Sequence, residues 1–86
     1  MSVKVKVYVI QSERDGRFYV GMSENVEERV KQHNKGMTVS TRFYKPWKLI
    51  FVEEYPNRLA ARTREKFLKA GSGKEYIKKW LRSSTE

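Results

Sequence analysis

The stretch VYVIQSERDGRFYVG, residues 7–21, decides the fold. It holds two β-prone runs on either side of Asp15-Gly16, and an Asp-Gly pair is a strong signal for a tight turn between antiparallel strands. The second run closes at Gly21. We therefore predict a β-hairpin over residues 3–21.

The first strand of this hairpin has two different faces. Residues 3–10 alternate with the period of a strand that buries one face, and the residues of that face are Val3, Val5, Val7 and Val9. Tyr8 points to the opposite face, and the hairpin register brings Tyr19 near it. Aromatic residues are common in paired strands for packing alone, so each tyrosine is open to a packing role or to a chemical one.

The composition is that of a small basic protein. The chain has 86 residues, enough for one modest core, and we predict a single domain over residues 1–86. It has no cysteine, which excludes disulfides and thiolate zinc sites. The net charge of +9 favours a polyanionic partner, above all nucleic acid. No apolar run approaches the roughly 20 residues of a membrane span, and no signal-peptide pattern follows Met1, so we predict a cytoplasmic protein without a membrane partner.

The rest of the chain alternates between helix and strand. After the hairpin, Ser23 or Asn25 can cap a helix that ends near Asn34, before Gly36. Residues 37–46 hold either a short helical turn or only a loop.

A third strand and two helices complete the chain. Residues 47–54 form a strand that is apolar enough to lie at the centre of the sheet. Helices follow over residues 58–70 and 74–82, with residues 71–73 (GSG) between them. The order ββαβαα, with a possible helical turn before the third strand, predicts an α+β fold in which helices flank a small three-stranded antiparallel sheet.

Helical positions supply candidates for phosphodiester chemistry, which needs a polarised water, positive charge near the phosphoryl oxygens and usually a cation held by a carboxylate. Arg29 and His33 lie one turn apart at the edge of a buried stripe, where a guanidinium can meet a phosphate. Glu65 lies just past an apolar arc that contains Leu59 and Phe67. A surface ion pair is the alternative for Arg29 and Glu65, and a structural hydrogen bond is the alternative for His33.

Several segments, taken in order, resemble the GIY-YIG nuclease family. They are VYV at 7–9, YVG at 19–21, NVEERVKQHNKG at 25–36, Ser40-Thr41 with Pro46-Trp47 ahead of a strand, and ARTREKFLK at 61–69. The likeness spans about residues 5–80 and is greatest to small standalone members and to the N-terminal nuclease domain of the bacterial excision-repair incision subunit. It implies a metal-dependent DNA endonuclease with a role in DNA repair or processing.

The resemblance also assigns roles to five residues. It implies that Glu65 binds Mg²⁺ or Mn²⁺ at a single site that is weak without substrate, and that Arg29 stabilises the phosphate. It implies as well that Tyr8 or Tyr19 helps to deprotonate or orient the attacking water, since nearby positive charge favours a phenolate. Of the two, we favour Tyr8 as the base and Tyr19 as its assistant. His33 stands where the family has Tyr or His, and we expect it to orient the water or the phosphate.

One position departs from the family pattern. The residue after the YVG glycine, often lysine in the repair branch, is Met22. A cation that could lower a tyrosine pKa or touch phosphate is therefore missing, so the mechanism depends more on the metal and Arg29. The same departure leaves open a second function, that of a catalytically weak or inactive nucleic-acid-binding module.

The remaining positive charge predicts a binding surface that is sensitive to salt and poor at reading sequence. We expect its contacts to come from Arg42, Lys45, Lys48, Lys69 and Lys74. Phe43 and Tyr44, in the same region, are expected in the core. DNA is the favoured partner, although the same charge would serve structured RNA, and no small-molecule cofactor is expected.

Overall fold

The structure is built around a three-stranded antiparallel sheet of order β2-β1-β3. The computed structural model describes residues 3–84, and the strands are β1 (Val5–Ser12), β2 (Phe18–Ser23) and β3 (Trp47–Tyr55). β1 and β2 form the predicted hairpin. The prediction of a central third strand is wrong, because β1 pairs with both neighbours whereas β3, within residues 3–84, pairs with β1 alone.

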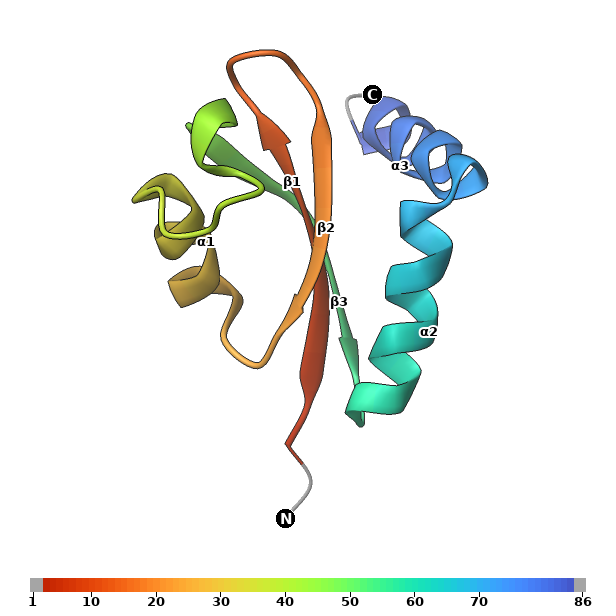
Figure 1. Ribbon diagram of the computed structural model, residues 1–86. Coiled ribbons are helices and arrows are strands. Elements are labelled where there is room, and N and C mark those ends of the chain that lie inside the picture. The colour runs from red at the N-terminus through yellow and green to blue at the C-terminus, as the bar shows by residue number, and fades with distance from the viewer. Residues whose placement is uncertain (1–2, 85–86) are drawn as a thin grey trace.

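Helices cover both faces of this sheet (Figure 1). α1 (Val26–Asn34) and the 3-10 turn η1 (Arg42–Tyr44) lie on one face, and α2 (Arg58–Lys69) and α3 (Gly71–Ser84) lie on the other. The order ββαβαα, with a short helical turn before β3, confirms the predicted α+β fold. Among the residues described, no helix has the length and apolar character required to cross a membrane.

β1 is buried on both faces and forms the centre of the core. The face toward α2 and α3 belongs to a cluster of Val5, Val7, Val9, Val20, Phe51, Ala61, Leu68 and Ile77. The opposite face belongs to a smaller cluster of Tyr8, Ile10, Val26 and Trp47. The alternation correctly predicted Val5, Val7 and Val9 in the first cluster, but Val3, predicted with them, is 57% exposed. Each fully buried side chain of this size contributes about 1.5–3 kcal/mol.

A β-bulge explains why an apolar run lies in an edge strand. Val9 pairs with Phe51 and Ile10 pairs with Leu49, so Ile50 is an extra residue in β3. Ile50 and Phe51 therefore pack on the same cluster, beneath α2 and α3, although they are consecutive. Bulges also discourage an edge strand from pairing with another chain.

The end of α1 is fixed to the start of β3. The helix begins at Asn25, whose side chain, rather than that of Ser23, accepts a hydrogen bond from a backbone N–H of the first turn. In the last turn, the Asn34 side chain accepts a hydrogen bond from the Trp47 backbone N–H at 2.6 Å and donates one to the Trp47 carbonyl at 3.0 Å. These bonds bring the segment between Asn34 and Trp47 back over the sheet.

The junction of α2 and α3 differs from the prediction. Gly71 and Gly73 were expected to separate the two helices, but they lie in the first turn of α3, and the chain breaks at Ala70 instead. Gly73 is buried, and a Cβ at this position would collide with the backbone of Phe67 and Leu68. Glycine therefore allows α3 to start directly against the end of α2.

The buried face of α2 also differs from the projected arc. Leu59 is 80% exposed and Phe67 is 39% exposed, whereas Ala61, Glu65 and Leu68 are buried. The small Ala61 side chain is fully buried and allows α2 to approach the sheet closely. This packing turns Glu65 inward rather than leaving it at the edge.

We expect Gly73→Ala to lower the free energy of unfolding by about 2 kcal/mol, because overpacking of a tight site costs about 1–3 kcal/mol. Gly71→Ala is the matched control in the same turn, since no atom lies within 4 Å of the position of its Cβ. It should be neutral or slightly stabilising. Urea unfolding followed by circular dichroism measures both, and equal effects would contradict the packing described for Gly73.

Candidate functional site

A chain of buried hydrogen bonds joins β1, α1 and the loop before β3. The Tyr8 hydroxyl lies 2.8 Å from His33 Nε2, and His33 Nδ1 lies 2.7 Å from Thr41 Oγ1. The three side chains are at most 1% exposed. His33 is thus fully buried, not at the edge of the stripe as projected, because the loop closes over it. Trp47 Nε1 holds that loop by donating to the Thr41 carbonyl at 2.9 Å.

This network determines the tautomer of His33. The Thr41 hydroxyl donates a long hydrogen bond of 3.5 Å to the Thr38 carbonyl, so its oxygen accepts from His33 Nδ1–H. Nε2 of the neutral imidazole is then an acceptor, and Tyr8 donates to it. The hydroxyl proton of Tyr8 therefore points to His33, and the Tyr8 oxygen can accept from other donors, of which the Arg29 guanidinium is one.

Burial keeps both Tyr8 and His33 neutral near pH 7. Burial raises the pKa of Tyr8 to about 12, Tyr19 adds to this shift, and Arg29 opposes it. Burial, followed by the charge of Arg29, lowers the pKa of His33 to about 4. Positive charge was expected to favour a Tyr8 phenolate. Arg29 acts in that direction, but desolvation is the larger effect, so the phenol form is favoured instead.

Gly21 makes room for the Tyr8 hydroxyl. The strand register places Gly21 opposite Tyr8, and a Cβ on residue 21 would lie 2.5 Å from the Tyr8 oxygen. Tyr19 precedes Gly21 by two residues on the same face of β2, with its ring centroid 5.0 Å from that of His33. Tyr8, Tyr19 and His33 therefore gather on the α1 face of the sheet, as expected for the two tyrosines.

Arg29 extends this group from the preceding turn of α1. Its charge lowers the pKa of both Tyr8 and His33, so the guanidinium lies within electrostatic reach of each. Its Nη1 donates to the Gln32 side-chain oxygen at 2.8 Å. In the part of the chain that the structure describes, the partners of Arg29 are the neutral side chains of Gln32 and Tyr8 and no carboxylate, which disfavours the ion-pair alternative. Its charge is therefore not neutralised.

Glu65 approaches from the opposite layer. Its side chain is 8% exposed and lies between Arg62, at 3.2 Å, and Lys69, at 3.5 Å. Its charge raises the pKa of Tyr8, although it is the smallest contribution, so the carboxylate acts on the hydroxyl across the sheet. Glu65 is thus an ion-pair partner, as the alternative reading held, and also a neighbour of the tyrosine group.

Glu65 by itself is an incomplete metal site. Residues 3–84 contain no group of three or more His, Asp or Glu side chains arranged to hold a metal ion. Mg²⁺ commonly takes one or two carboxylates and completes its coordination with waters and substrate phosphate. A single buried carboxylate between two cations fits a site that forms only together with a phosphate, because the phosphate would then share Arg62 and Lys69.

The predicted nucleic-acid contacts are exposed but fall into two groups. One group lies at η1 and the start of β3 and consists of Arg42, Lys45 and Lys48. The other lies at the junction of α2 and α3 and consists of Lys69 and Lys74. The second group adjoins the candidate site directly, because Lys69 forms an ion pair with Glu65.

The aromatic pair of η1 only partly follows its prediction. Phe43 is 64% exposed, so its expected place in the core is wrong. Tyr44 is half-buried and packs on the Tyr8 cluster, beneath an Arg17 guanidinium 3.6 Å from its ring centroid. The 3-10 turn points the two rings to different sides. The sequence left residues 37–46 open between a helical turn and a loop, so it could not predict these directions.

Two residues of this site were not among the candidates. Thr41 fixes the tautomer of His33, and Gly21 provides the space for Tyr8. The hydroxyl-rich composition of residues 37–46 was a signal for Thr41, but no local pattern says which hydroxyl meets a histidine eight residues earlier. For Gly21, the cross-strand register opposite Tyr8 was the available signal.

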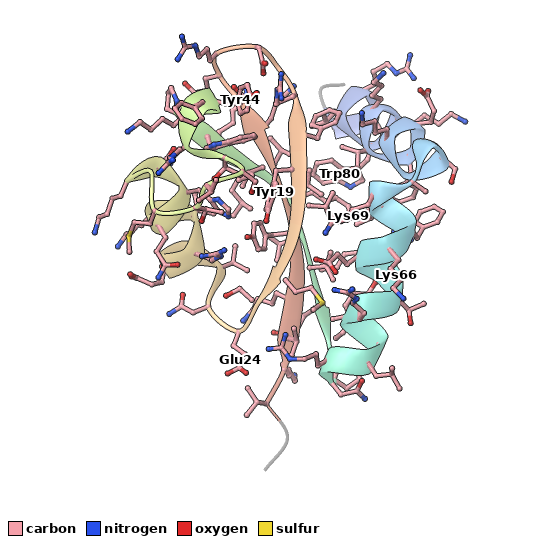
Figure 2. All side chains as sticks on the ribbon, viewed as in Figure 1. Tyr19, Glu24, Tyr44, Lys66, Lys69 and Trp80 are labelled. Atoms are coloured by element: carbon pink, nitrogen blue, oxygen red, sulfur yellow. The ribbon has the colours of Figure 1, made fainter. Side chains whose placement is uncertain are left out.

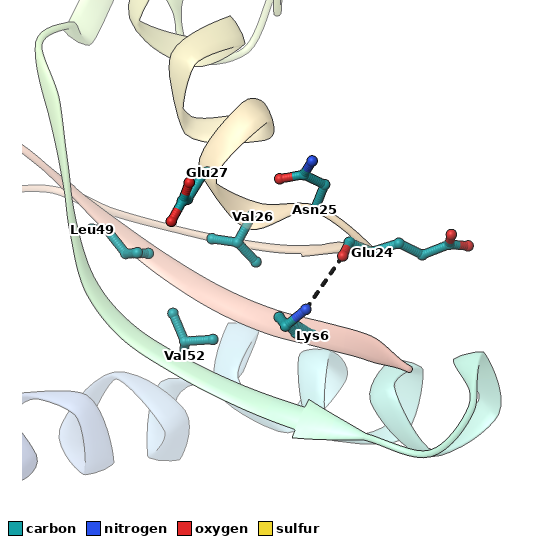
Figure 3. Close-up of a pocket in the computed structure, with 7 residues that line it drawn as sticks. All are labelled: Lys6, Glu24, Asn25, Val26, Glu27, Leu49 and Val52. Atoms are coloured by element: carbon teal, nitrogen blue, oxygen red, sulfur yellow. Dashed lines mark hydrogen bonds between the residues drawn. The ribbon is translucent and has the colours of Figure 1, made fainter. Parts of the chain in front are cut away.

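A separate hollow of about 420 Å³ lies on the α1 face, between β3 and the start of α1 (Figure 3). Leu49 and Val52 give it an apolar wall, and Lys6 on its floor donates to the Glu24 carbonyl at 3.3 Å. The Glu27 side chain also lines it. Its carboxylates disfavour a phosphate, and no candidate catalytic residue lines it, so we place the candidate site at β2 instead.

Comparison with protein families agrees with this geometry. The model of the GIY-YIG catalytic domain matches residues 4–85. The chain belongs to the GIY-YIG family. This is a family of nucleases, and the membership that the sequence motifs predicted is confirmed.

Relatives of this GIY-YIG domain are similar over most of their length. A UPF0213 protein of Clostridium perfringens is 36% identical, over 73% of this chain and 68% of the relative. A UPF0213 protein of Streptococcus sanguinis is 34% identical, over 80% of this chain and 79% of the relative. The solution NMR structure of a UPF0213 protein of Bacillus halodurans has a TM-score of 0.55 at 26% identity, and the match covers 90% of this chain and 84% of that one.

We expect Thr41→Val to change the tautomer of His33, because it removes the acceptor of the Nδ1–H bond. The buried N–H left unpaired should also cost about 1–3 kcal/mol of stability. Imidazole ¹⁵N chemical shifts report the tautomer directly, and Thr41→Ser, which keeps the hydroxyl, should restore the wild-type shifts. Unchanged shifts in Thr41→Val would refute the assignment.

The free energy of unfolding should fall as the pH drops from about 6.5 toward about 4. His33 has its pKa lowered to about 4 in the folded chain, so over this range the unfolded chain binds the additional proton. Stability from the neutral imidazole is complete above the unfolded pKa and is lost as pH falls through the folded one. His33→Gln should remove this component but keep that of the carboxylates. Parallel pH profiles for the two proteins would contradict the expectation.

Proposed function

We propose that the protein is a cytoplasmic, divalent-metal-dependent endonuclease that hydrolyses phosphodiester bonds in DNA during repair or processing. One observation carries the proposal. Arg29, with no carboxylate partner among the described residues, and a hydrogen-bonded Tyr8–His33 pair lie on one side of β2, and Glu65 acts on the same hydroxyl from the other. A guanidinium, a proton acceptor and a carboxylate are the groups that phosphodiester hydrolysis needs, and here they are gathered at β2 from its two sides.

Tyr8 acts through His33 rather than as a free phenolate. With a pKa of about 12, roughly one Tyr8 side chain in 10⁵ is ionised at pH 7. The hydrogen bond offers another route. As the attacking water gives a proton to the Tyr8 oxygen, the Tyr8 hydroxyl proton moves to His33 Nε2, so no isolated phenolate forms.

Arg29 links substrate binding to this proton transfer. Its charge contributes to the low pKa of His33, so a phosphate that pairs with Arg29 offsets that charge and makes the imidazole a better acceptor. The same guanidinium stabilises the charge that develops on the phosphoryl oxygens. Tyr19, packed edge-on against His33, holds the imidazole in place and lies beside the path of the water.

Glu65 is the residue that would hold the metal. A divalent cation bound there with waters and phosphate would supply additional positive charge for the leaving group and the attacking water. Met22 carries no charge, and it packs partly buried on the core cluster that contains Val5 and Ile77. Lys69, 3.5 Å from Glu65, is the cation nearest to this carboxylate after Arg62, and it can meet the phosphate instead.

The second candidate is a catalytically weak or inactive nucleic-acid-binding module. It is favoured by the two ion pairs of Glu65, because a carboxylate that already pairs with Arg62 and Lys69 has less need of a metal ion. This function predicts salt-dependent binding that survives Glu65→Gln, with no cleavage at any metal concentration. Competition among duplex DNA, branched DNA and RNA would identify its substrate.

We expect the purified protein to nick supercoiled plasmid in the presence of Mg²⁺ or Mn²⁺ and to lose this activity in EDTA. Glu65→Gln and Arg29→Ala should each reduce the nicking rate by about 10²–10³-fold, the typical cost of removing a group that stabilises transition-state charge. The gel-resolved rate of open-circle formation is the measurement.

Exposed residues of α1 provide matched controls for this experiment. Glu28→Gln removes a carboxylate and Lys31→Ala removes a cation, and both positions are exposed on the side of α1 that faces away from the sheet. Both variants should nick like the wild type. Plasmid that stays intact under permissive metal and salt, or equal nicking by all four variants, would overturn the endonuclease proposal.

A further inference from the structure

A basic groove leads away from the candidate site along α3. Three adjoining hollows of about 180, 520 and 430 Å³ share the Phe18 side chain as a common wall. The first also contains Tyr19, and the last reaches Leu81 at the far end of α3. From the proposed function, on which this inference rests, we infer that the groove binds a single-stranded polynucleotide tail next to the scissile phosphate.

The phosphates of the tail would lie along one face of α3. The cations that line the groove from this helix are spaced four residues apart, at Lys74, Lys78 and Arg82. Four residues span about 6 Å along a helix, so these side chains form a row on one face. Such a row follows one phosphodiester backbone and gives binding that depends on salt but not on sequence.

The opposite wall can receive unpaired bases. Phe18 is partly exposed in all three hollows, and Val20, Leu68 and Ile77 provide the apolar floor of the smallest. Base stacking on an aromatic ring beside a basic groove is the usual way to bind single strands. In a duplex the faces of the bases are already stacked on each other, so only an unpaired base can reach Phe18.

The groove ends at the residues that the proposed chemistry uses. Lys69 lines the smallest hollow and also forms the ion pair with Glu65, and Tyr19 lines the same hollow. Figure 2 shows Tyr19 and Lys69 on the two sides of β2, so the groove meets the candidate site at this strand. A tail seated on α3 would therefore position the adjoining phosphodiester near Glu65.

The carboxylates near the groove do not oppose a phosphate. Asp15 lines the middle hollow, but the Arg17 guanidinium offsets its charge, because Arg17 Nε donates to its Oδ2 at 2.7 Å and the Arg17 backbone N–H donates to its Oδ1 at 3.1 Å. Glu75 Oε1 lies 3.8 Å from Lys78 Nζ, and both side chains are more than half exposed. This ion pair is therefore weak, and a phosphate can replace Glu75 as the partner of Lys78. The charges of Lys74 and Lys78 therefore remain available to a phosphate.

Fluorescence anisotropy in EDTA, where metal-dependent cleavage cannot occur, tests the groove. The wild-type chain is titrated with a short blunt DNA duplex and with the same duplex carrying a single-stranded DNA or RNA tail of several nucleotides at the 3′ or the 5′ end. We expect at least one tail to tighten binding about tenfold, the effect of one or two stacked bases and a few phosphate contacts. Comparison of the arms identifies the sugar and the polarity.

Two variants locate the effect. Lys74→Gln with Lys78→Gln should abolish the gain from the tail, which is measured as the ratio of the affinities for the tailed and the blunt duplex. Phe18→Leu keeps an apolar side chain but removes the aromatic face, so it should lose several-fold in affinity for the tailed duplex only. Lys31→Gln with Lys35→Gln is the matched control, because it removes the same charge at the same spacing from the last turn and the C-cap of α1, a helix on the other face of the sheet.

The outcomes separate this inference from the proposed function. Three results would overturn binding of the tail in the groove. They are no increase in affinity with any tail, an increase that survives in the α3 variant, and an equal loss of the increase in the α1 control. Cleavage of blunt and tailed DNA without any tail gain would leave the endonuclease proposal intact. A tail gain that depends on α3, in a protein that never cleaves, would support the groove and overturn the endonuclease.

Discussion

The hydrogen bond from Tyr8 to His33 is the constraint on which the rest of the structure depends. It places two polar groups in the interior, and an unpaired buried polar group would cost about 1–3 kcal/mol. Both side chains therefore depend on a further residue. Thr41 accepts the second hydrogen bond of His33, and Gly21 leaves space for the Tyr8 hydroxyl. The loop before β3 must then return over α1, and the Asn34–Trp47 hydrogen bonds hold it there.

The same interaction explains how a site forms in so small a chain. β1 is buried on both faces, so its valines build the main core while Tyr8 carries polar chemistry to the opposite layer. Burial raises the pKa of Tyr8 and lowers that of His33, which makes a neutral donor–acceptor pair over the whole physiological range. Arg29 is the charged group through which a bound phosphate can alter that balance.

Local patterns predicted the fold well wherever the determining contacts are local. The hairpin, the Asn25 cap and the order of elements follow from turn, capping and periodicity signals within a few residues. The sequence predictions fail where a contact between segments far apart in the chain determines the structure. The bulge at Ile50 lets an apolar strand lie at the edge, and the close approach of α2 turns Glu65 inward. Neither effect has a signal in the nearby sequence.

The candidate site shows the same difference between what local sequence determines and what distant contacts determine. The sequence alone determined the family, the strand order along the chain and the residue types from which phosphodiester chemistry could be built, because these depend on motifs and on residue identity. Only the tertiary structure decided that Tyr8 is a neutral donor to His33, that Thr41 sets the tautomer, and that Glu65 is turned inward between Arg62 and Lys69. The physical reason is that desolvation and hydrogen-bond direction depend on what surrounds a group in three dimensions, and here those surroundings come from segments far apart in the chain.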